Sequence, residues 1–275
     1  GYLTRVEKVG TLGGRRVEAA WEYDAQGNVV AQWRGDAVKT GPNAIDLWQL
    51  SFDNPLLPTV TTVTDPLGAD SIYTLDRDTT SRKPKLVSLS GSCPACSTGP
   101  NSTLAYNDSS HPLRPTLETD ARGHQTSTTY DAHGQLLTRT EAMGETAERT
   151  TTWSYDLTYP ALVAEIRRPS TAGGASERVT TFTYSTSGAL TQRLEEGVEM
   201  PGGAYSLPTV FTPSPEGQIL VVDPPGFTTA DQTLFTYDPA RGSLVVSGRT
   251  DPLIGTTAFG YDAFNRRTSV TDPNG

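Results

Sequence analysis

The sequence lacks several features that would place it in common protein classes. It has no apolar run of about 18 residues, so we expect no membrane span. No stretch sustains a 3.6-residue apolar period, so we expect helix in less than about a tenth of the residues, against a typical third. The net charge is −9 and basic residues gather only in short pairs such as Arg15-Arg16. Nucleic acid is therefore not an expected partner, because phosphate binding needs concentrated Lys and Arg.

Hydrophobic residues are also less abundant than in a typical compact domain, at 35% of the chain. Threonine, serine, glycine and proline fill the gap. This composition favours a thin sheet with much solvent-facing surface over a globule with a thick core. The length of 275 residues fits one large β domain or two smaller ones and does not decide between them.

What the chain does have is an internal repeat: an aromatic residue, a spacer, a tyrosine and an aspartate, with a glycine three positions later. The clearest copies are residues 21–27 (WEYDAQG) and 259–265 (FGYDAFN), and in the second copy Asn265 takes the place of the glycine. Related copies occur at residues 128–134, 153–156, 182–188 and 235–242. Self-similarity of this kind indicates a repeat architecture.

The repeat has the chemistry of a hairpin turn. An aspartate at the first position of a type I turn accepts hydrogen bonds from amides two residues on, and a residue with positive φ closes a three-residue loop. We therefore predict structural turn roles for the aspartates and for the closing residues, which are Asp24, Gly27, Asp131, Gly134, Gly188, Asp262 and Asn265. Asparagine suits the last position because it tolerates the left-handed region better than other residues with a side chain.

A second turn alternates with the first, with aspartate first, proline second and glycine fourth. It occurs at residues 65–68, 223–226 and 272–275, and without proline at 120–123. The segments between the two turn types have the length of single strands. The sequence therefore predicts an all-β chain, a repetitive antiparallel hairpin meander over residues 1–275 with an irregular insert at about 79–118. We predict strands at 124–130, 135–140, 243–250, 256–261 and 266–271.

Residues two apart on a strand share a face, so each repeat places an aromatic ring beside a tyrosine. Stacked across strands, these rings would form ladders that stabilise the sheet. The alternative is a row of exposed tyrosines that binds sugars or a peptide. We favour packing, because aromatic residues with a period of two are usually structural.

These alternating turns resemble those of the YD-repeat or Rhs-repeat family, which includes Rhs proteins, the cocoon-forming components of Tc toxins, wall-associated proteins and teneurins. The resemblance covers roughly residues 15–275. It implies a β-sheet shell, secreted or at the cell surface, whose partners are the remainder of a longer chain and an enclosed toxin or other cargo. The self-cleaving segment of Rhs proteins has no match here. Both ends of the sequence also look cut from something longer.

No candidate chemistry outweighs the structural interpretation. Cys93 and Cys96 have the spacing of redox and metal motifs, but zinc needs four ligands, so a local disulfide is favoured over free thiols and over a metal site. His111, His124 and His133 lie at or near turns or in a Pro-flanked loop. We predict no catalytic residue, cofactor or metal. The alternative function is an extracellular module that binds a glycan or a cell-surface protein, through the outer face or a loop such as 79–118.

Overall fold

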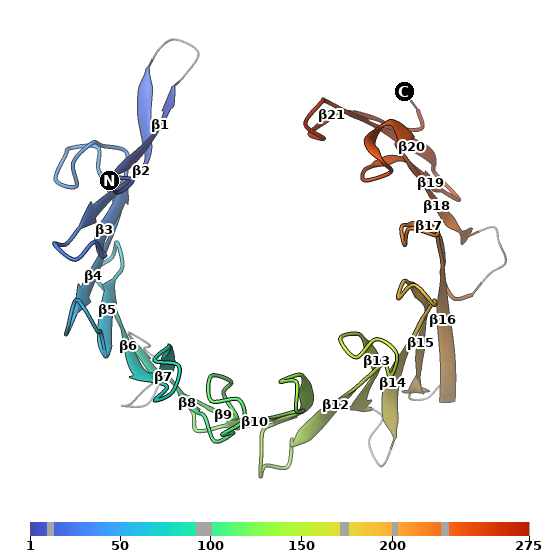
Figure 1. The fold of residues 1–275 in the computed structure, drawn as a ribbon, viewed down its shortest axis with the longest axis horizontal. Coiled ribbons are helices and arrows are strands. Elements are labelled where there is room, and N and C mark those ends of the chain that lie inside the picture. Colours follow the sequence, from blue (N-terminus) through green and yellow to red (C-terminus); the bar gives the residue numbers. More distant parts are fainter. Residues whose placement is uncertain (10–13, 92–100, 171–175, 200–202, 227–230, 275) are drawn as a thin grey trace. The chain divides into compact units, whose positions relative to one another are not determined.

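The structure is a computed structural model that describes residues 1–9, 14–91, 101–170, 176–199, 203–226 and 231–274 (Figure 1). The described residues form 21 strands, and helix is limited to short 3-10 segments such as η2 (Pro239–Arg241). The predicted all-β antiparallel fold is confirmed. No helix in the described ranges is long and apolar enough to cross a membrane.

The chain divides into two compact units, Gly1–Glu148 and Arg149–Gly275. In the first unit each strand pairs antiparallel with the next strand along the chain, from β1 to β11. Its strands are β1 (Arg5–Val9), β2 (Arg15–Tyr23), β3 (Val29–Arg34), β4 (Ile45–Phe52), β5 (Val60–Thr64), β6 (Asp70–Arg77), β7 (Pro84–Gly91), β8 (Ser102–Ala105), β9 (Leu117–Asp120), β10 (Gln125–Tyr130) and β11 (Leu136–Glu141).

The second unit has the same sequential pairing. Its strands are β12 (Arg149–Tyr155), β13 (Val163–Pro169), β14 (Glu177–Tyr184), β15 (Leu190–Glu199), β16 (Gly203–Pro213), β17 (Ile219–Asp223), β18 (Thr233–Tyr237), β19 (Val246–Asp251), β20 (Gly255–Tyr261) and β21 (Arg267–Thr271). Four of the five predicted strands match these bounds within about a residue. The fifth, 243–250, begins at Val246, because the turn that starts at Asp238 continues through the left-handed residue Ser243 to Val245, whose carbonyl accepts from the Asp238 amide.

The strands connect at two edges in strict alternation. The edge on which the repeated tyrosines end their strands is called the tyrosine edge, and the opposite one the proline edge. In the first unit the tyrosine edge carries the turns at 24–28, 53–59, 78–83, 106–116 and 131–135. In the second unit it carries those at 156–162, 185–189, 214–218, 238–245 and 262–266. The expected irregular insert at 79–118 thus contains β7 and β8 and two such turns, while residues 92–100 lie outside the described residues.

A β-bulge follows the turn in each clear repeat, a feature that the sequence did not reveal. Glu22 pairs with Ala31 but the next residue, Tyr23, pairs with Val29, so β3 carries one extra residue. The same shift occurs opposite Tyr130, Tyr155, Tyr184, Tyr237 and Tyr261. A bulge increases the local twist of a sheet and re-aims the side chains beyond it.

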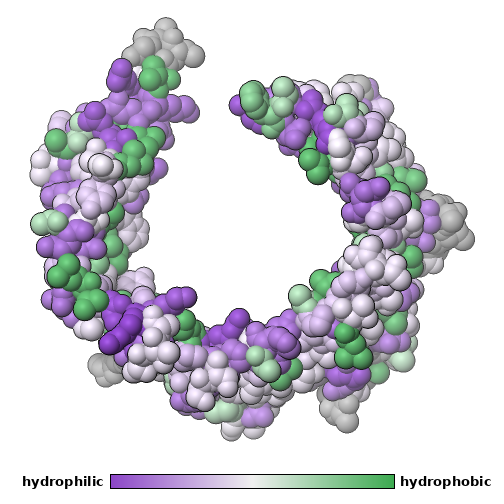
Figure 2. Space-filling model, viewed as in Figure 1, coloured by the Kyte–Doolittle hydropathy of each residue, from purple (hydrophilic) through white to green (hydrophobic). Residues whose placement is uncertain are grey.

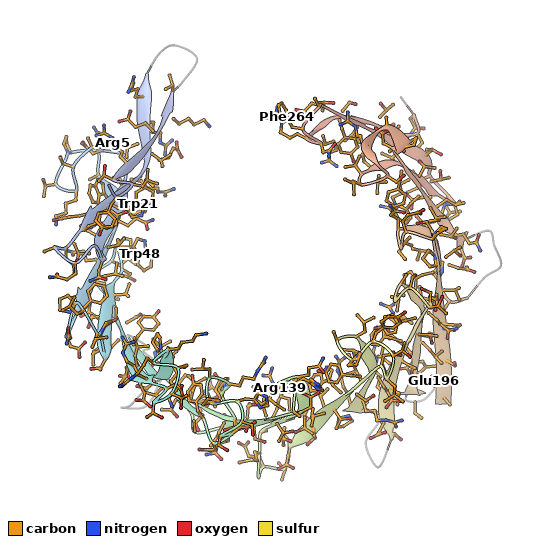
Figure 3. All side chains as sticks on the ribbon, in the orientation of Figure 1. Arg5, Trp21, Trp48, Arg139, Glu196 and Phe264 are labelled. Atoms are coloured by element: carbon orange, nitrogen blue, oxygen red, sulfur yellow. The ribbon has the colours of Figure 1, made fainter. Side chains whose placement is uncertain are left out.

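Little of the described chain is buried. The buried hydrophobic residues are Val17, Ala20, Ala31 and Trp33, with Ala44 and Leu47 packed against them. The accessible surface is 17665 Å², whereas size scaling gives roughly 11,500 Å² for a compact monomer of this mass. Side chains project from both faces of the strands (Figure 3), and hydrophilic and hydrophobic residues alternate over the visible surface (Figure 2). The sheet is thus a single layer over most of its strands.

Candidate functional site

The first repeated turn shows how the motif closes a hairpin. The Asp24 carboxylate accepts hydrogen bonds from the amides of Gln26 and Asn28, at 2.9 and 2.8 Å. The Gly27 amide donates to the Asp24 carbonyl at 3.1 Å, and Gly27 has a φ of 88°. This is a type I turn followed by a left-handed residue, a standard three-residue hairpin loop.

The other predicted turn residues have the same geometry. The carboxylates of Asp131 and Asp262 each accept from the amides two and four residues on, at 2.8 to 3.0 Å. Gly134 has a φ of 79° and Asn265 a φ of 60°. At Gly188, with a φ of 80°, the turn begins with Ser185, whose hydroxyl accepts from two amides at the longer distances of 3.1 and 3.3 Å. These side chains face their own turns, not a shared cavity.

Sequence reasoning missed several turns of the same edge. Asp53, Asp78, Asp108 and Ser214 also accept hydrogen bonds from amides of their own turns. The turn at Ser214 could have been found from the sequence. Residues 211–217 (FTPSPEG) keep the spacing of the repeat, with proline in place of tyrosine and serine in place of aspartate. The others are concealed because their loops are longer or lack the closing glycine.

The turn hydrogen bonds favour the ionised form of the aspartates. Amide donors, that of Gln135 first, lower the pKa of Asp131, and the amide of Arg266 does the same for Asp262. The hydroxyl of Thr59 and the amide of Val60 lower the pKa of Asp53 to about 2. A general acid needs the opposite shift, toward the working pH. The turn aspartates are therefore anions whose hydrogen-bonding capacity is directed at the backbone.

The repeated tyrosines connect neighbouring strands through their hydroxyls. Tyr261, at the end of β20, donates to the carbonyl of Val246, the first residue of β19, at 2.8 Å. Tyr237 and Tyr184 do the same to the first residues of β17 and β13, at 3.0 and 2.7 Å. Tyr23, Tyr106 and Tyr130 donate to carbonyls on or just before the preceding strand, at 2.7 to 2.9 Å. Each of these hydroxyls therefore binds one hairpin to the strand before it.

The expected aromatic ladders do not form. In the described part of the chain the aromatic ring contacts are Tyr2 on Tyr23, with centroids 4.9 Å apart, and His111 on Tyr130 at 6.4 Å. Strands that carry the motif alternate with strands that lack it, so equivalent rings lie two strand spacings apart, roughly 9 to 10 Å. Arginines contact several of the rings instead, including Arg267 over Phe259 at 5.8 Å.

Side chains also join successive turns along the tyrosine edge. Arg241 forms an ion pair with Asp238 in its own turn and donates to the carbonyls of Tyr261 and Asp262 in the next one, at 2.9 and 2.5 Å. Gln218 donates to the Ser243 carbonyl, Asn28 to that of Pro55 and Tyr159 to that of Thr186. These contacts join the turn at 24–28 to that at 53–59 in the first unit. In the second unit they join the turn at 156–162 to that at 185–189, and the turn at 238–245 to those at 214–218 and 262–266.

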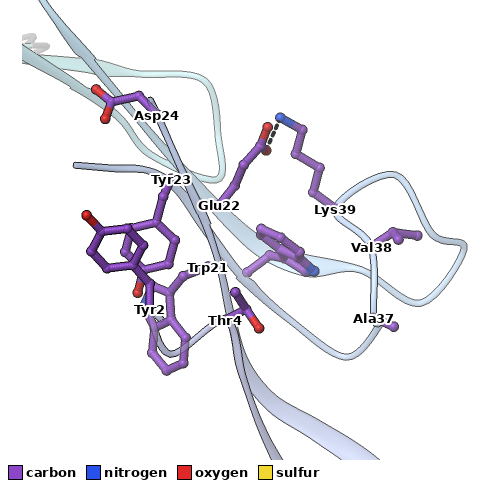
Figure 4. Close-up of a pocket in the computed structure, with 10 residues that line it drawn as sticks. Tyr2, Thr4, Trp21, Glu22, Tyr23, Asp24, Ala37, Val38 and Lys39 are labelled. Carbon is purple, nitrogen blue, oxygen red and sulfur yellow. Dashed lines mark ion pairs between the residues drawn. The ribbon is translucent and has the colours of Figure 1, made fainter. Parts of the chain in front are cut away.

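A groove of about 590 Å³ lies at the beginning of the first unit (Figure 4). The residues around it include Tyr2, Trp21 and Tyr23 on one side of β2 and Val38 on the other (Figure 4). Trp33 also belongs to the lining, and because it pairs with Ala20 its side chain lies on the face of the sheet opposite to Trp21. An ion pair between Glu22 and Lys39 lies at its margin. An aromatic lining with a few polar groups is typical of small-molecule sites.

The histidines each lie beside one carboxylate: His111 Nδ1 is 2.9 Å from Asp108, His124 Nδ1 is 2.5 Å from Glu145 and His133 Nδ1 is 3.7 Å from Asp131. Within the described ranges, no three His, Cys, Asp or Glu side chains gather as metal ligands would. Cys93 and Cys96 lie outside the described residues, so their disulfide stays a prediction.

Comparison with known proteins identifies the last hairpins. Residues 237–275 match the family model of the RHS Repeat. This confirms the resemblance for that segment, which comprises η2 and the strands β19 to β21. A search of curated proteins found no match.

The solved structures that align with nearly the whole chain include two crystal structures of TcdB2-TccC3. The crystal structure of TcdB2-TccC3 is 15% identical over 99% of this chain and 17% of its own, with a TM-score of 0.42. The crystal structure of TcdB2-TccC3 without its hypervariable C-terminal region is also 15% identical, over 99% of this chain and 16% of its own, with a TM-score of 0.43. The chain thus spans less than a fifth of the length of each of these two proteins.

Proposed function

We propose that this chain is a structural segment of a larger, secreted or surface-displayed Rhs-like shell that encloses a toxin or other cargo. The observation that carries the proposal is that the repeated residues make structural contacts. The aspartates hold their own turns, the glycines supply positive φ, and the tyrosine hydroxyls hold neighbouring strands. The motif therefore builds sheet.

A single-layer sheet suits enclosure for a physical reason. Each strand satisfies its backbone hydrogen bonds through its two neighbours, and each hairpin adds roughly 10 Å of wall. A wall of this kind needs no thick core, which agrees with the few buried hydrophobic residues among those described. The RHS Repeat match supports the same role for residues 237–275.

Protease access in the full-length natural protein tests the proposal. A recognition sequence for a site-specific protease is inserted at one of two places. One is a segment outside residues 1–275 that the proposal assigns to the cargo, and the other is the exposed proline-edge loop at 142–148. The loop site should be cut in the native protein, and the cargo site only after unfolding in urea. Equal cutting rates at both sites in the native protein would contradict enclosure.

The proposal also includes that these 275 residues catalyse nothing by themselves. The repeated residues on which it rests all have structural contacts. A screen of the purified chain for hydrolase activity and self-cleavage checks this. Turnover abolished by one Asp or His substitution would contradict it.

A further inference from the structure

A small pocket lies on one face of the strands β18 to β21 in the second unit. It has a volume of about 260 Å³ and is lined by Phe235, Val246, Arg249, Phe259, Tyr261 and Arg267. The strand register brings these side chains together. Phe235 lies opposite Arg249, Arg249 opposite Thr257, and Tyr261 opposite Arg267. Because Thr257, Phe259 and Tyr261 alternate along β20, the rings and both arginines share one face of the sheet.

The floor of this pocket is apolar and held in place. The rings of Phe235, Phe259 and Tyr261 are all half-buried, and the Tyr261 hydroxyl is fixed by its hydrogen bond to the Val246 carbonyl at 2.8 Å. The volume is smaller than the roughly 300–1,000 Å³ of sites for drug-sized ligands. The pocket therefore suits one large apolar side chain better than a whole small molecule.

The charged groups of the pocket are arginines, and no carboxylate belongs to its lining. Arg249 donates from Nε and Nη2 to one oxygen of Asp251, at 3.1 and 2.6 Å, and its side chain is 51% exposed. The guanidinium of Arg267 lies 5.8 Å from the centre of the Phe259 ring. Arg267 is exposed and forms no ion pair within the described ranges. Its N–H donors are thus available to an anion beside the apolar floor.

We propose that this pocket binds an acidic peptide, with one large apolar side chain of the peptide on the floor and neighbouring carboxylates on Arg267 and Arg249. Charge complementarity carries the proposal, because a guanidinium binds a carboxylate through two parallel hydrogen bonds. Aromatic and arginine side chains around a small pocket are also the usual anchors of protein interfaces. The proposal goes beyond the shell role and does not depend on it, since it needs only these four strands.

Titration of the 275-residue chain with short fluorescein-labelled peptides tests the proposal. Each acidic peptide has a central Trp, Phe, Leu or Met between pairs of glutamates, and its neutral counterpart has glutamines instead. A further peptide has a central serine between glutamates, and labelled single-stranded oligothymidine represents the competing class of polyanion. Fluorescence anisotropy should saturate with at least one acidic peptide. Its neutral counterpart and the serine peptide should bind about tenfold more weakly, and added salt should weaken the acidic peptide more than the neutral one.

Matched variants locate the binding. Arg267→Gln should weaken it about tenfold, whereas Asp251→Asn should strengthen it, because it releases Arg249 from its present partner. Arg193→Gln is the control, since Arg193 lies opposite Phe182 as Arg249 lies opposite Phe235 but in another hairpin. It should leave the affinity unchanged within about twofold.

Circular dichroism melting shows that each variant is folded. Equal affinity for the acidic and neutral peptides, or unchanged affinity in Arg267→Gln, would overturn the proposal. So would saturation by oligothymidine but by no peptide, or by none of the probes.

Discussion

The hairpins β2–β3 and β20–β21 carry the two clearest copies of the same repeat in different surroundings. Over the first, the connection from residue 35 to residue 44 contributes Ala44 to a small core, and Trp33 is 6% exposed with its indole donating to the Asp36 carbonyl at 3.0 Å. On the second, the ring of Phe259 is half-buried and Phe264, at the tip of the turn, is 79% exposed.

The turns themselves are nonetheless alike. Asp24 and Asp262 accept the same pair of amide hydrogen bonds, and Tyr23 and Tyr261 each donate to a carbonyl of the preceding segment, at 2.7 and 2.8 Å. The comparison shows that local hydrogen bonds define the repeat. A buried core forms only in the first hairpin, where the long connection at residues 35–44 packs against the strands. The stability of each region should therefore depend on different residues.

The largest effect should come from the core. Trp33→Ala should lower the free energy of unfolding of its region by about 3–5 kcal/mol, because it leaves a large cavity beneath residues 35–44. Phe259→Ala removes a ring that is only half-buried and should cost less than half as much. Urea denaturation followed by circular dichroism compares the two. Equal losses would mean that the hairpin β20–β21 has a core equivalent to that of β2–β3.

Turn closure should come next, tested in hairpins without a buried core. Gly134→Val should cost more than about 1 kcal/mol, because a β-branched residue resists a φ of 79°. An added Cβ there would also lie 2.8 Å from Arg114 Nε and 3.0 Å from the His111 ring. Gly123→Val is the matched control, since its φ is 89° and nothing lies within 4 Å of the added atom.

The difference between these two variants measures the crowding on the tyrosine edge. Both should lower the urea midpoint, and Gly134→Val should lower it further. If Gly123→Val were equally damaging, backbone strain alone would account for both. If neither variant changed the midpoint, positive φ at the closing residue would not limit the stability of these hairpins.

The tyrosine hydroxyls should contribute less to the free energy of unfolding than the core or the turn glycines do. Their contribution should be equal in the hairpins β2–β3 and β20–β21. Tyr23→Phe and Tyr261→Phe each remove one hydrogen bond and should each cost about 0.5–1.5 kcal/mol. Tyr73→Phe is the control, because the structure gives the Tyr73 hydroxyl no partner in the described part of the chain. Thermal melting measures all three. A cost at Tyr73 equal to that at Tyr261 would contradict the bridging role.

Much of this architecture was accessible from the sequence because turn chemistry is local. Asp24, Gly27 and Asn265 predicted their hairpins from four or five consecutive residues, and the intervals between turns then fixed the strands and the antiparallel pairing. The bulges were not predictable, because an extra residue on one strand is defined only against its partner.

The tyrosine hydrogen bonds and the contacts of Tyr2 could not be predicted either, because they also depend on partners elsewhere in the chain. The carbonyl that Tyr184 contacts lies 21 residues earlier, and no pattern around Val163 marks it. Tyr2 reaches Tyr23 only because the residues before β1 run beside the end of β2, where the Thr4 carbonyl accepts from the Trp21 amide. Periodicity assigned these rings to one face correctly, but it could not show that strands without the motif separate them.

The smallest effect concerns a contact on the proline edge, away from both compared hairpins. His124 Nδ1 lies 2.5 Å from Glu145, which raises the pKa of His124 above its ordinary value, and Asp120 adds to the shift while Arg122 opposes it. A raised pKa means that the pair stabilises the fold fully at a pH below the unfolded pKa and loses this contribution as the pH rises through the folded pKa. Both side chains are about half exposed, so salt should weaken the shift.

An NMR titration of the His124 ring should place its midpoint above that of a model peptide, and Glu145→Gln should lower it. An unchanged midpoint in Glu145→Gln would show that this contact does not hold the two turns together in solution.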